Sequence, residues 1–151
     1  MTTETEHFQM LWREYEDVHD HAPASAREVV DWAVAHRGLR LPRIDPRDAL
    51  ASQMSRALRE EYATDAQGRR YRVNHAMRIT KSGVQTTIWG ILGRAPQLHM
   101  QRAFTQRREQ VIGDLVQLQV DVEVYNEMNP HQPPIQLVLD FADDVAERRA
   151  G

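Results

Sequence analysis

The hydrophobic residues at the start of the chain recur every three or four positions, which is the period of an amphipathic α-helix. The first predicted helix covers residues 6–20, and its apolar stripe is Phe8, Leu11, Trp12, Tyr15 and His19. A second helix is predicted to begin after Ser25, because serine followed three residues later by Glu28 is the pattern of a capping box. This helix buries valines and alanines and ends near Gly38.

A third helix is predicted between Asp45 and Tyr62. Asp45 suits the N-cap position and Pro46 suits the first helical turn. Residues 39–44, which precede it, are expected to form an extended connection or a short strand, and residues 65–68 are expected to close the helix. Its apolar positions lie on one face: Leu50, Met54, Ala57, Leu58 and Tyr62.

The clearest β pattern is the strict alternation of apolar and polar residues from Arg70 to Ile79. Residues 80–83 are the predicted turn, and a second strand follows from Val84. Pairing Ile79 with Val84 places the apolar side chains on one face of the hairpin. Trp89 then lies beside the arginines on the other face.

Two patterns compete in the segment that begins at Pro96. A heptad seam predicts a long helix over residues 95–128; its members are Phe104, Val111, Leu115, Leu118, Val122 and Tyr125. Residues 116–125 also alternate between apolar and polar positions, which is typical of a strand, and only Gly113 separates them from the residues before. We favour the helix, and the strand stays open as the alternative.

The chain ends with an extended segment over residues 135–141 and an acidic helical turn over residues 142–149. The predicted fold class is therefore α+β, mainly helical, with a central antiparallel β-hairpin and a long helix in the C-terminal half. A length of 151 residues fits one domain. Its expected parts are an N-terminal helix over 1–24, a helix–helix–hairpin core over 25–93, the long helix over 95–128 and a tail over 129–151.

Composition excludes several classes of protein. The chain has no cysteine, so a disulfide framework, a thiolate zinc site and a thiol nucleophile are ruled out. Residues 1–6 are polar and acidic, unlike a signal peptide, and no apolar run reaches the roughly 18 residues of a membrane span. We expect a soluble, cytoplasmic protein. Arginine outnumbers lysine eighteen to one, a bias associated with GC-rich, bacterial genomes.

The charges are strongly segregated along the chain. Residues 37–108 hold fifteen of the nineteen cationic side chains and only five acids, whereas both flanking segments are acidic. A basic block of this kind is typical of a segment that binds a polyanion. The alternative is that the acidic flanks fold back and neutralise it.

The order of elements between Ser25 and Leu92 resembles a winged-helix module. In that family one helix presents side chains to the DNA major groove, while the hairpin contacts a neighbouring groove or the backbone. The resemblance depends on element order, and the third helix is unbroken where a winged helix has two. Trp89 is expected to stack on a base or an arginine, or to pack against a helix. The implied nucleic-acid contacts are Arg56, Arg59, Arg70, Arg72, Arg78 and Lys81.

A second resemblance lies near the C-terminus. Residues 136–141 are similar to the peptide with which bacterial DNA polymerases and replication regulators dock on the sliding clamp. In such a peptide the glutamine amide forms hydrogen bonds, and the leucines and the terminal aromatic ring fill an apolar pocket. The same residues also fit an edge strand. The candidate docking residues are Gln136, Leu137, Leu139 and Phe141.

The sequence contains no recognisable catalytic, phosphate-loop or metal-binding motif. His19 and His21 have no further ligand at a recognisable spacing. We therefore expect a non-enzymatic protein without metal or cofactor. The leading hypothesis is a DNA-associated accessory or regulatory protein; the alternative is a protein–protein adaptor that docks through residues 136–141, possible partners being the clamp or another protein. The long helix is a candidate for homodimerisation, unless the first two helices cover its seam.

Overall fold

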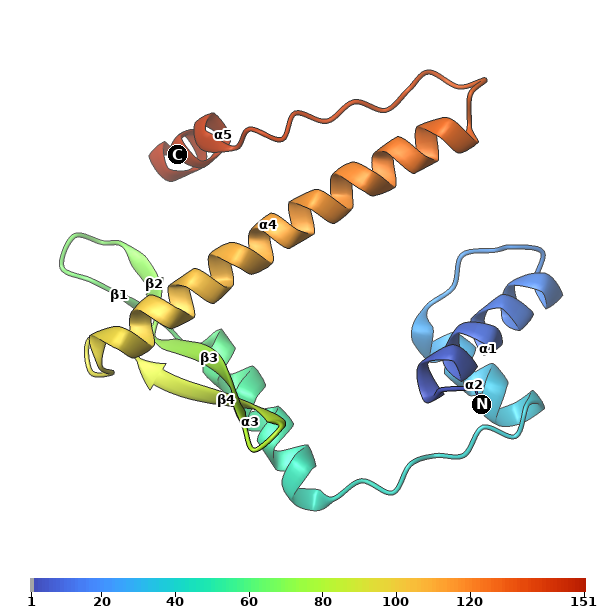
Figure 1. Cartoon of the computed structure of the whole chain (residues 1–151), viewed down its shortest axis with the longest axis horizontal. Helices are drawn as coiled ribbons and strands as arrows, with labels where there is room; N and C mark the ends of the chain where they lie inside the picture. The colour runs from blue at the N-terminus through green and yellow to red at the C-terminus, as the bar shows by residue number, and fades with distance from the viewer. Residues whose placement is uncertain (1) are drawn as a thin grey trace. The chain divides into compact units, whose positions relative to one another are not determined.

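The structure, a computed structural model, describes residues 2–151, and this part contains five helices and two antiparallel hairpins (Figure 1). The predicted α+β class, mainly helical with a hairpin and a long helix in the C-terminal half, is confirmed. The chain forms two compact units, one running to Ser52 and the other from Gln53 to Gly151. The boundary falls inside helix α3 (Pro46–Glu60).

The first unit contains a pair of helices, α1 (Glu4–Val18) and α2 (Ala26–His36). Each begins with a capping box, in which the side chain of Thr3 or Ser25 accepts a hydrogen bond from the backbone three residues on. The box at Ser25 confirms the prediction. Helix α1 begins two residues earlier than expected, because Thr3 caps it.

Aromatic side chains join α1 to α2. Leu11 is buried, and the ring of Trp32 meets that of Tyr15 edge-on at a centroid distance of 5.5 Å. Arg37 lies over Trp32, 4.5 Å from the ring centroid, and its Nε donates to Glu14 at 2.8 Å. Arg37, at the C-terminal end of α2, thus makes a cation–π contact within its own helix end and an ion pair with α1.

Helix α3 begins as predicted, because Oδ1 of Asp45 accepts a hydrogen bond from the backbone N–H of Arg47 at 2.9 Å. It ends earlier than predicted. Tyr62, expected on the helix, lies instead in a short strand that the sequence did not indicate. Residues 39–44 form no strand, so this segment is an extended connection.

The short strand β1 (Tyr62–Thr64) pairs with β2 (Arg70–Arg72). Asp65 organises the turn between them: its Oδ1 accepts from the backbone N–H groups of Gln67 and Arg69, each at 2.9 Å. Its Oδ2 accepts from Nε of Arg69 at 2.7 Å. The hydrogen bond from the Arg69 backbone is the main reason that the pKa of Asp65 lies below its ordinary value.

The predicted single strand over residues 70–79 is two strands that meet at Val73. The N–H of Val73 donates to the carbonyl of Glu61 at 3.2 Å, and its own carbonyl accepts from Leu92 at 2.8 Å. This bend lets residues 70–72 pair with β1, while the residues that follow pair with a different strand.

The main hairpin is formed by β3 (Asn74–Lys81) and β4 (Val84–Ile91), as expected. Its register was predicted wrongly: Ile79 pairs with Thr86, two residues beyond Val84. A shift of two residues keeps every side chain on its predicted face.

The error in register comes from the turn. The structure has a two-residue connection in which Ser82 and Gly83 both have positive φ angles, 53° and 78°. Such turns match the twist of the paired strands, and glycine adopts the conformation readily. Because Lys81 pairs with Val84, the strands extend to the tip of the hairpin.

Helix α4 (Gln97–Met128) is 32 residues long and begins after Pro96. Residues 116–125 lie within it, so the helical prediction is confirmed and the strand alternative is wrong. Gly113 does not interrupt the helix, since a helical glycine costs only about 1 kcal/mol relative to alanine.

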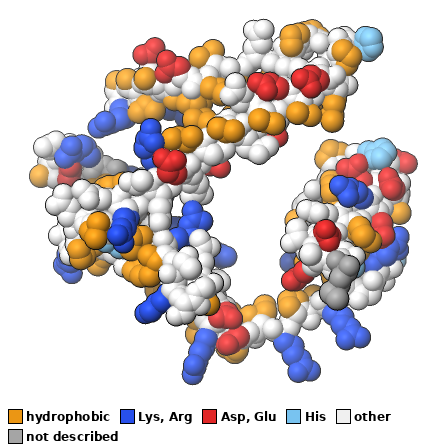
Figure 2. Space-filling model, in the orientation of Figure 1, with side chains coloured by type: hydrophobic (Ala, Val, Ile, Leu, Met, Phe, Trp, Pro, Cys, Tyr) orange, Lys and Arg blue, Asp and Glu red, His pale blue; other side chains and the backbone are white. Residues whose placement is uncertain are grey.

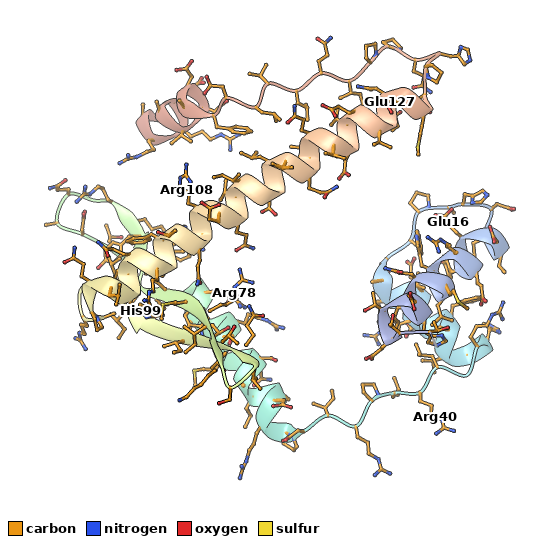
Figure 3. All side chains as sticks on the ribbon, viewed as in Figure 1. Glu16, Arg40, Arg78, His99, Arg108 and Glu127 are labelled. Atoms are coloured by element: carbon orange, nitrogen blue, oxygen red, sulfur yellow. The ribbon has the colours of Figure 1, made fainter. Side chains whose placement is uncertain are left out.

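The start of α4 packs directly on the hairpin. Ala103 and Met77 are buried there, and His99 lies where the helix meets the strands (Figure 3). A Cβ atom added to Gly90 would lie 2.7 Å from Cβ of Ala95 and 2.8 Å from Nε2 of His99. Only glycine allows this close approach of helix and strand.

Beyond α4, residues 129–132 form a turn, in which the N–H of Gln132 donates to the carbonyl of Asn129 at 3.2 Å, and residues 133–141 lead outside any strand to helix α5 (Ala142–Ala150). The side-chain amide of Asn126 holds this tail through both backbone groups of Ile135, accepting from its N–H and donating to its carbonyl at 2.9 Å each. No helix within residues 2–151 is both long enough and apolar enough to span a membrane.

Candidate nucleic-acid interface

Four arginines surround a pocket of about 420 Å³ in the second unit. They come from four different elements: the end of α3, strand β2, strand β3 and the first third of α4. Figure 3 labels Arg78 on its strand. We call this feature the arginine pocket; its arginines are Arg59, Arg72, Arg78 and Arg107.

Buried polar groups hold the walls of the arginine pocket together. The side-chain amide of Asn74, which is buried, donates to the carbonyl of Leu58 at 3.1 Å and to Oε1 of Glu61 at 2.8 Å. These two bonds tie the end of α3 to the start of β3. The position of Arg59 relative to the hairpin therefore depends on Asn74.

Two histidines join the hairpin to its neighbours. The Nε2–H of His75 donates to the carbonyl of Arg72 at 2.8 Å, and that of His99 donates to the carbonyl of His75 at 2.9 Å; because carbonyls only accept, Nε2 carries a proton in both rings. Burial lowers the pKa of His75 below its ordinary value, and the charges of Arg107 and Arg72 lower it further. His75 is a neutral, structural ring.

The arginine pocket carries uncompensated positive charge. None of its four arginines forms an ion pair with a carboxylate of residues 2–151. Its described lining contains no aspartate or glutamate. The carboxylate of Glu61 lies outside the lining, where it accepts a hydrogen bond from the lining residue Asn74. Within the second unit, the acidic C-terminal segment (residues 109–151) therefore forms no ion pair with these arginines.

A second pocket, of about 390 Å³, adjoins the first. The two share Arg72, His75 and Arg107 in their linings. The second pocket adds Arg70, whose guanidinium lies 3.9 Å from the ring centroid of Tyr62. Five arginines thus line two adjacent hollows.

An aromatic side chain lies within the arginine pocket. Trp89 is half-buried, and the guanidinium of Arg59 lies 5.6 Å from its ring centroid. The register places Trp89 opposite Ala76 and Thr87 opposite Arg78, so all four share one face of the hairpin. Trp89 contacts an arginine, one of its two expected roles.

The structure brings together four of the six predicted contact residues. Arg59, Arg72 and Arg78 line the arginine pocket, and Arg70 lines the adjoining one. Arg56 and Lys81 line neither; Lys81 lies at the hairpin tip.

Sequence reasoning missed Arg107. It lies at the end of the basic block, but α4 carries no local pattern that separates it from its neighbours. Packing of α4 along β3 brings Arg107 to the pocket. The one available signal was that the basic block runs into the helix as far as Arg108.

The four predicted docking residues lie on the tail. Residues 136–140 belong to no strand, and Phe141 is the residue before α5. Gln136, Leu137 and Phe141 are exposed, whereas Leu139 is half-buried. The edge-strand alternative is therefore not adopted in this structure.

No three histidine, aspartate or glutamate side chains of residues 2–151 gather in a way that could hold a metal ion. His19 and His21 form local contacts: Nδ1 of His19 lies 2.7 Å from the carbonyl of Tyr15, and that of His21 lies 2.7 Å from Oε1 of Glu16.

No protein-family model matches the chain, and no curated protein or solved structure matches it either.

Proposed function

We propose that the protein is a non-enzymatic, DNA-associated accessory protein that binds the nucleic-acid backbone in the arginine pocket and the pocket adjoining it. One observation carries the proposal. Five arginines that form no ion pair with a carboxylate of residues 2–151 line two adjacent hollows, one of which also contains Trp89. Guanidinium groups match phosphate oxygens in geometry and charge.

The arrangement favours a polymer over a single anion. A lone phosphate would occupy one hollow, whereas Arg72 and Arg107 line both hollows, so that successive phosphates of one strand can contact the two together. Trp89 adds a ring on which a base can stack, a contact that contributes about 1–3 kcal/mol per base. Charge along a track with an aromatic ring is typical of surfaces that bind nucleic acid.

Fluorescence anisotropy with a labelled random duplex and a labelled single strand tests the proposal. Binding is expected at low salt, and Arg72→Ala, Arg78→Ala and Arg107→Ala are each expected to weaken it roughly tenfold, about 1.4 kcal/mol. Arg56→Ala is the matched control, because Arg56 lies on the same helix as Arg59 but outside both pockets.

Two outcomes contradict this assignment. Absence of binding at low salt rules out the nucleic-acid function. If Arg56→Ala weakens nucleic-acid binding as much as the pocket variants do, the contact lies on the exposed side of α3, as in a winged helix, and the pockets are not the binding site.

A second candidate function is docking on a partner protein, the sliding clamp by resemblance, through residues 136–141. The tail supports it because this segment is extended and outside any sheet, and Val138 is 82% exposed. An extended peptide with free backbone groups can add to a partner surface while alternate side chains fill its pockets.

Surface plasmon resonance against a bacterial sliding clamp tests this docking. Gln136→Ala and Phe141→Ala are expected to abolish binding of the full chain, since both remove motif side chains. Val138→Ala is the matched control, because position 138 is unspecified in the motif. Absence of clamp binding, or equal loss in the control, contradicts the candidate.

A further inference from the structure

A third hollow, with a mainly apolar lining, adjoins the arginine pocket. Its volume is about 660 Å³, and Asn74 and Trp89 belong to the linings of both. Arg94 is the one arginine of its described lining, which contains no carboxylate. Figure 2 shows cationic and hydrophobic side chains next to one another on the hairpin and the start of α4. We call this feature the apolar hollow; its aliphatic and proline members are Leu58, Ile88, Ile91, Ala95 and Pro96.

The elements around the apolar hollow are fixed to one another. The amide of Asn74 donates to the carbonyl of Leu58, which ties the end of α3 to β3. At Gly90 strand β4 lies so close to the start of α4 that an added Cβ atom would overlap Ala95 and His99. The apolar hollow therefore exists before any ligand arrives, as is usual for binding sites.

Trp89 is placed to receive a base rather than to enter a duplex. It is half-buried and lies opposite Ala76, whereas the tip of the hairpin is the pair Lys81 and Val84. Side chains that open a duplex are apolar wedges that insert between base steps. A ring within a lining cannot be inserted in this way, so the base has to come to the ring. Bases inside a duplex have both faces covered by their neighbours.

The contact between Trp89 and Arg59 leaves room for a base. The guanidinium of Arg59 lies 5.6 Å from the ring centroid, compared with 3.9 Å for Arg70 over Tyr62. Arg59 is itself exposed, so it can move from the ring toward a phosphate. Stacking of a base on an aromatic ring accepts any base, because every base has a π face.

The arginine pocket also offers polar groups that suit the edge of an unpaired base. Thr87 and Gln110 line it, and both side chains are exposed. A hydroxyl and a side-chain amide can each donate and accept hydrogen bonds. In a duplex the Watson–Crick edges are already paired, so these groups favour a single strand.

We propose that the preferred ligand of this site is a single-stranded nucleic acid, whose phosphates lie on the arginines while an unpaired base stacks on Trp89 at the apolar hollow. This inference rests on the proposed function, under which the strand is DNA, and goes beyond it by selecting the single strand over the duplex. A duplex still contacts the arginines through its phosphates, but its bases add nothing, so it binds more weakly.

Fluorescence anisotropy with four labelled probes of equal length tests the preference on the full chain. The probes are a DNA strand that cannot pair with itself, the same strand annealed to its complement, an abasic strand with the same phosphates, and the RNA strand of the same sequence. The DNA strand is expected to bind about tenfold more tightly than the duplex or the abasic strand, because only it supplies a stacked base.

The four probes separate failure of this inference from failure of the proposed function. A duplex or an abasic strand that binds as tightly as the DNA strand overturns the base contact and leaves phosphate binding intact. Tighter binding of the RNA strand overturns the assignment to DNA. Absence of binding to every probe overturns the proposed function together with this inference.

Substitutions of Trp89 test the stacking. Trp89→Ala is expected to lower the ratio of single-strand to duplex affinity about tenfold, whereas Trp89→Phe keeps a ring and most of the preference. Because the ratio compares two ligands on one variant, partial unfolding, which weakens both, does not imitate the effect. Trp12→Ala is the matched control, since Trp12 is also exposed but belongs to α1. An unchanged ratio in Trp89→Ala, or an equal fall in Trp12→Ala, overturns the inference.

A second pair of variants tests the apolar hollow. Ile88→Asp is expected to lower the same ratio severalfold, because the carboxylate makes the hollow unfavourable for a base. Thr86→Asp is the control: Thr86 lies two residues away on the same strand and outside the three hollows. Equal ratios in the two variants show that no base lies at the apolar hollow and overturn that part of the proposal.

Discussion

The side-chain amide of Gln106 binds both backbone groups of Arg78: its Oε1 accepts from the N–H and its Nε2 donates to the carbonyl, each at 2.8 Å. A side chain of α4 thereby occupies the free edge of β3, which would otherwise expose unpaired backbone groups. The same contact holds the backbone of Arg78 against α4, which also carries Arg107. Asn126 repeats this type of bond with Ile135 of the tail.

Replacing Gln106 with alanine is expected to lower the free energy of unfolding of the second unit by about 1–2 kcal/mol, because two hydrogen bonds are lost. Urea denaturation measures the change. Gln110→Ala is the control: Gln110 also lines the arginine pocket but forms none of these bonds. Equal stability of the two variants contradicts a structural role for the amide pair.

Gly90→Ala is expected to destabilise the second unit by about 1–3 kcal/mol, because the new methyl group overlaps Ala95 and His99. Thermal unfolding measures it. Adding Ala95→Gly removes the closest of these contacts, at 2.7 Å, and is expected to recover part of the loss. A Gly90→Ala variant as stable as the wild type contradicts the close packing of α4 on the hairpin.

Stability is expected to fall as the pH drops below the ordinary pKa of His75, 6.5. The folded-state pKa is lower, so the unfolded chain binds the proton first; stability is complete above pH 6.5 and is lost as the pH falls toward the folded value. Urea denaturation across pH measures this slope. The slope of stability with pH is expected to diminish in His75→Gln. It is expected to persist in His131→Gln, which changes a histidine of the exposed tail. If the two variants have the same slope, His75 is not a neutral, buried ring.

Asp65→Asn is expected to loosen the β1–β2 turn, because the amide offers one acceptor oxygen where the carboxylate offers two. Faster amide exchange at Gln67 and Arg69 measures the effect. The lowered pKa of Asp65 adds a pH dependence: the turn is complete above its ordinary value of 3.8 and is lost as the pH falls through the folded value. Unchanged exchange in the variant contradicts the role of the carboxylate.

Local signals in the sequence predicted most of the helices. The capping box at Ser25 and the cap at Asp45 act within a few residues, so their pattern was sufficient. The hairpin faces were also predictable from the alternation in residues 70–79. The register was not, because it depends on the φ angles of Ser82 and Gly83, and serine rarely adopts a positive φ.

Features that depend on distant contacts were missed. Strand β1 has only three residues, and its pairing requires the turn that Asp65 holds. Arg107 joins the arginine pocket only because α4 packs along β3, which no spacing within the helix indicates. The basic block itself was visible in the sequence, and it contains every arginine of the two pockets.

The salt dependence of nucleic-acid binding tests the central claim most directly. The logarithm of the binding constant is expected to fall linearly with the logarithm of salt concentration, by about 0.9 for each duplex phosphate contacted. The triple variant Arg72→Ala, Arg78→Ala, Arg107→Ala is expected to reduce this slope by about two to three units. No binding by the wild type at the lowest salt, or an unchanged slope in the triple variant, contradicts the assignment of the arginine pocket as the phosphate-binding site.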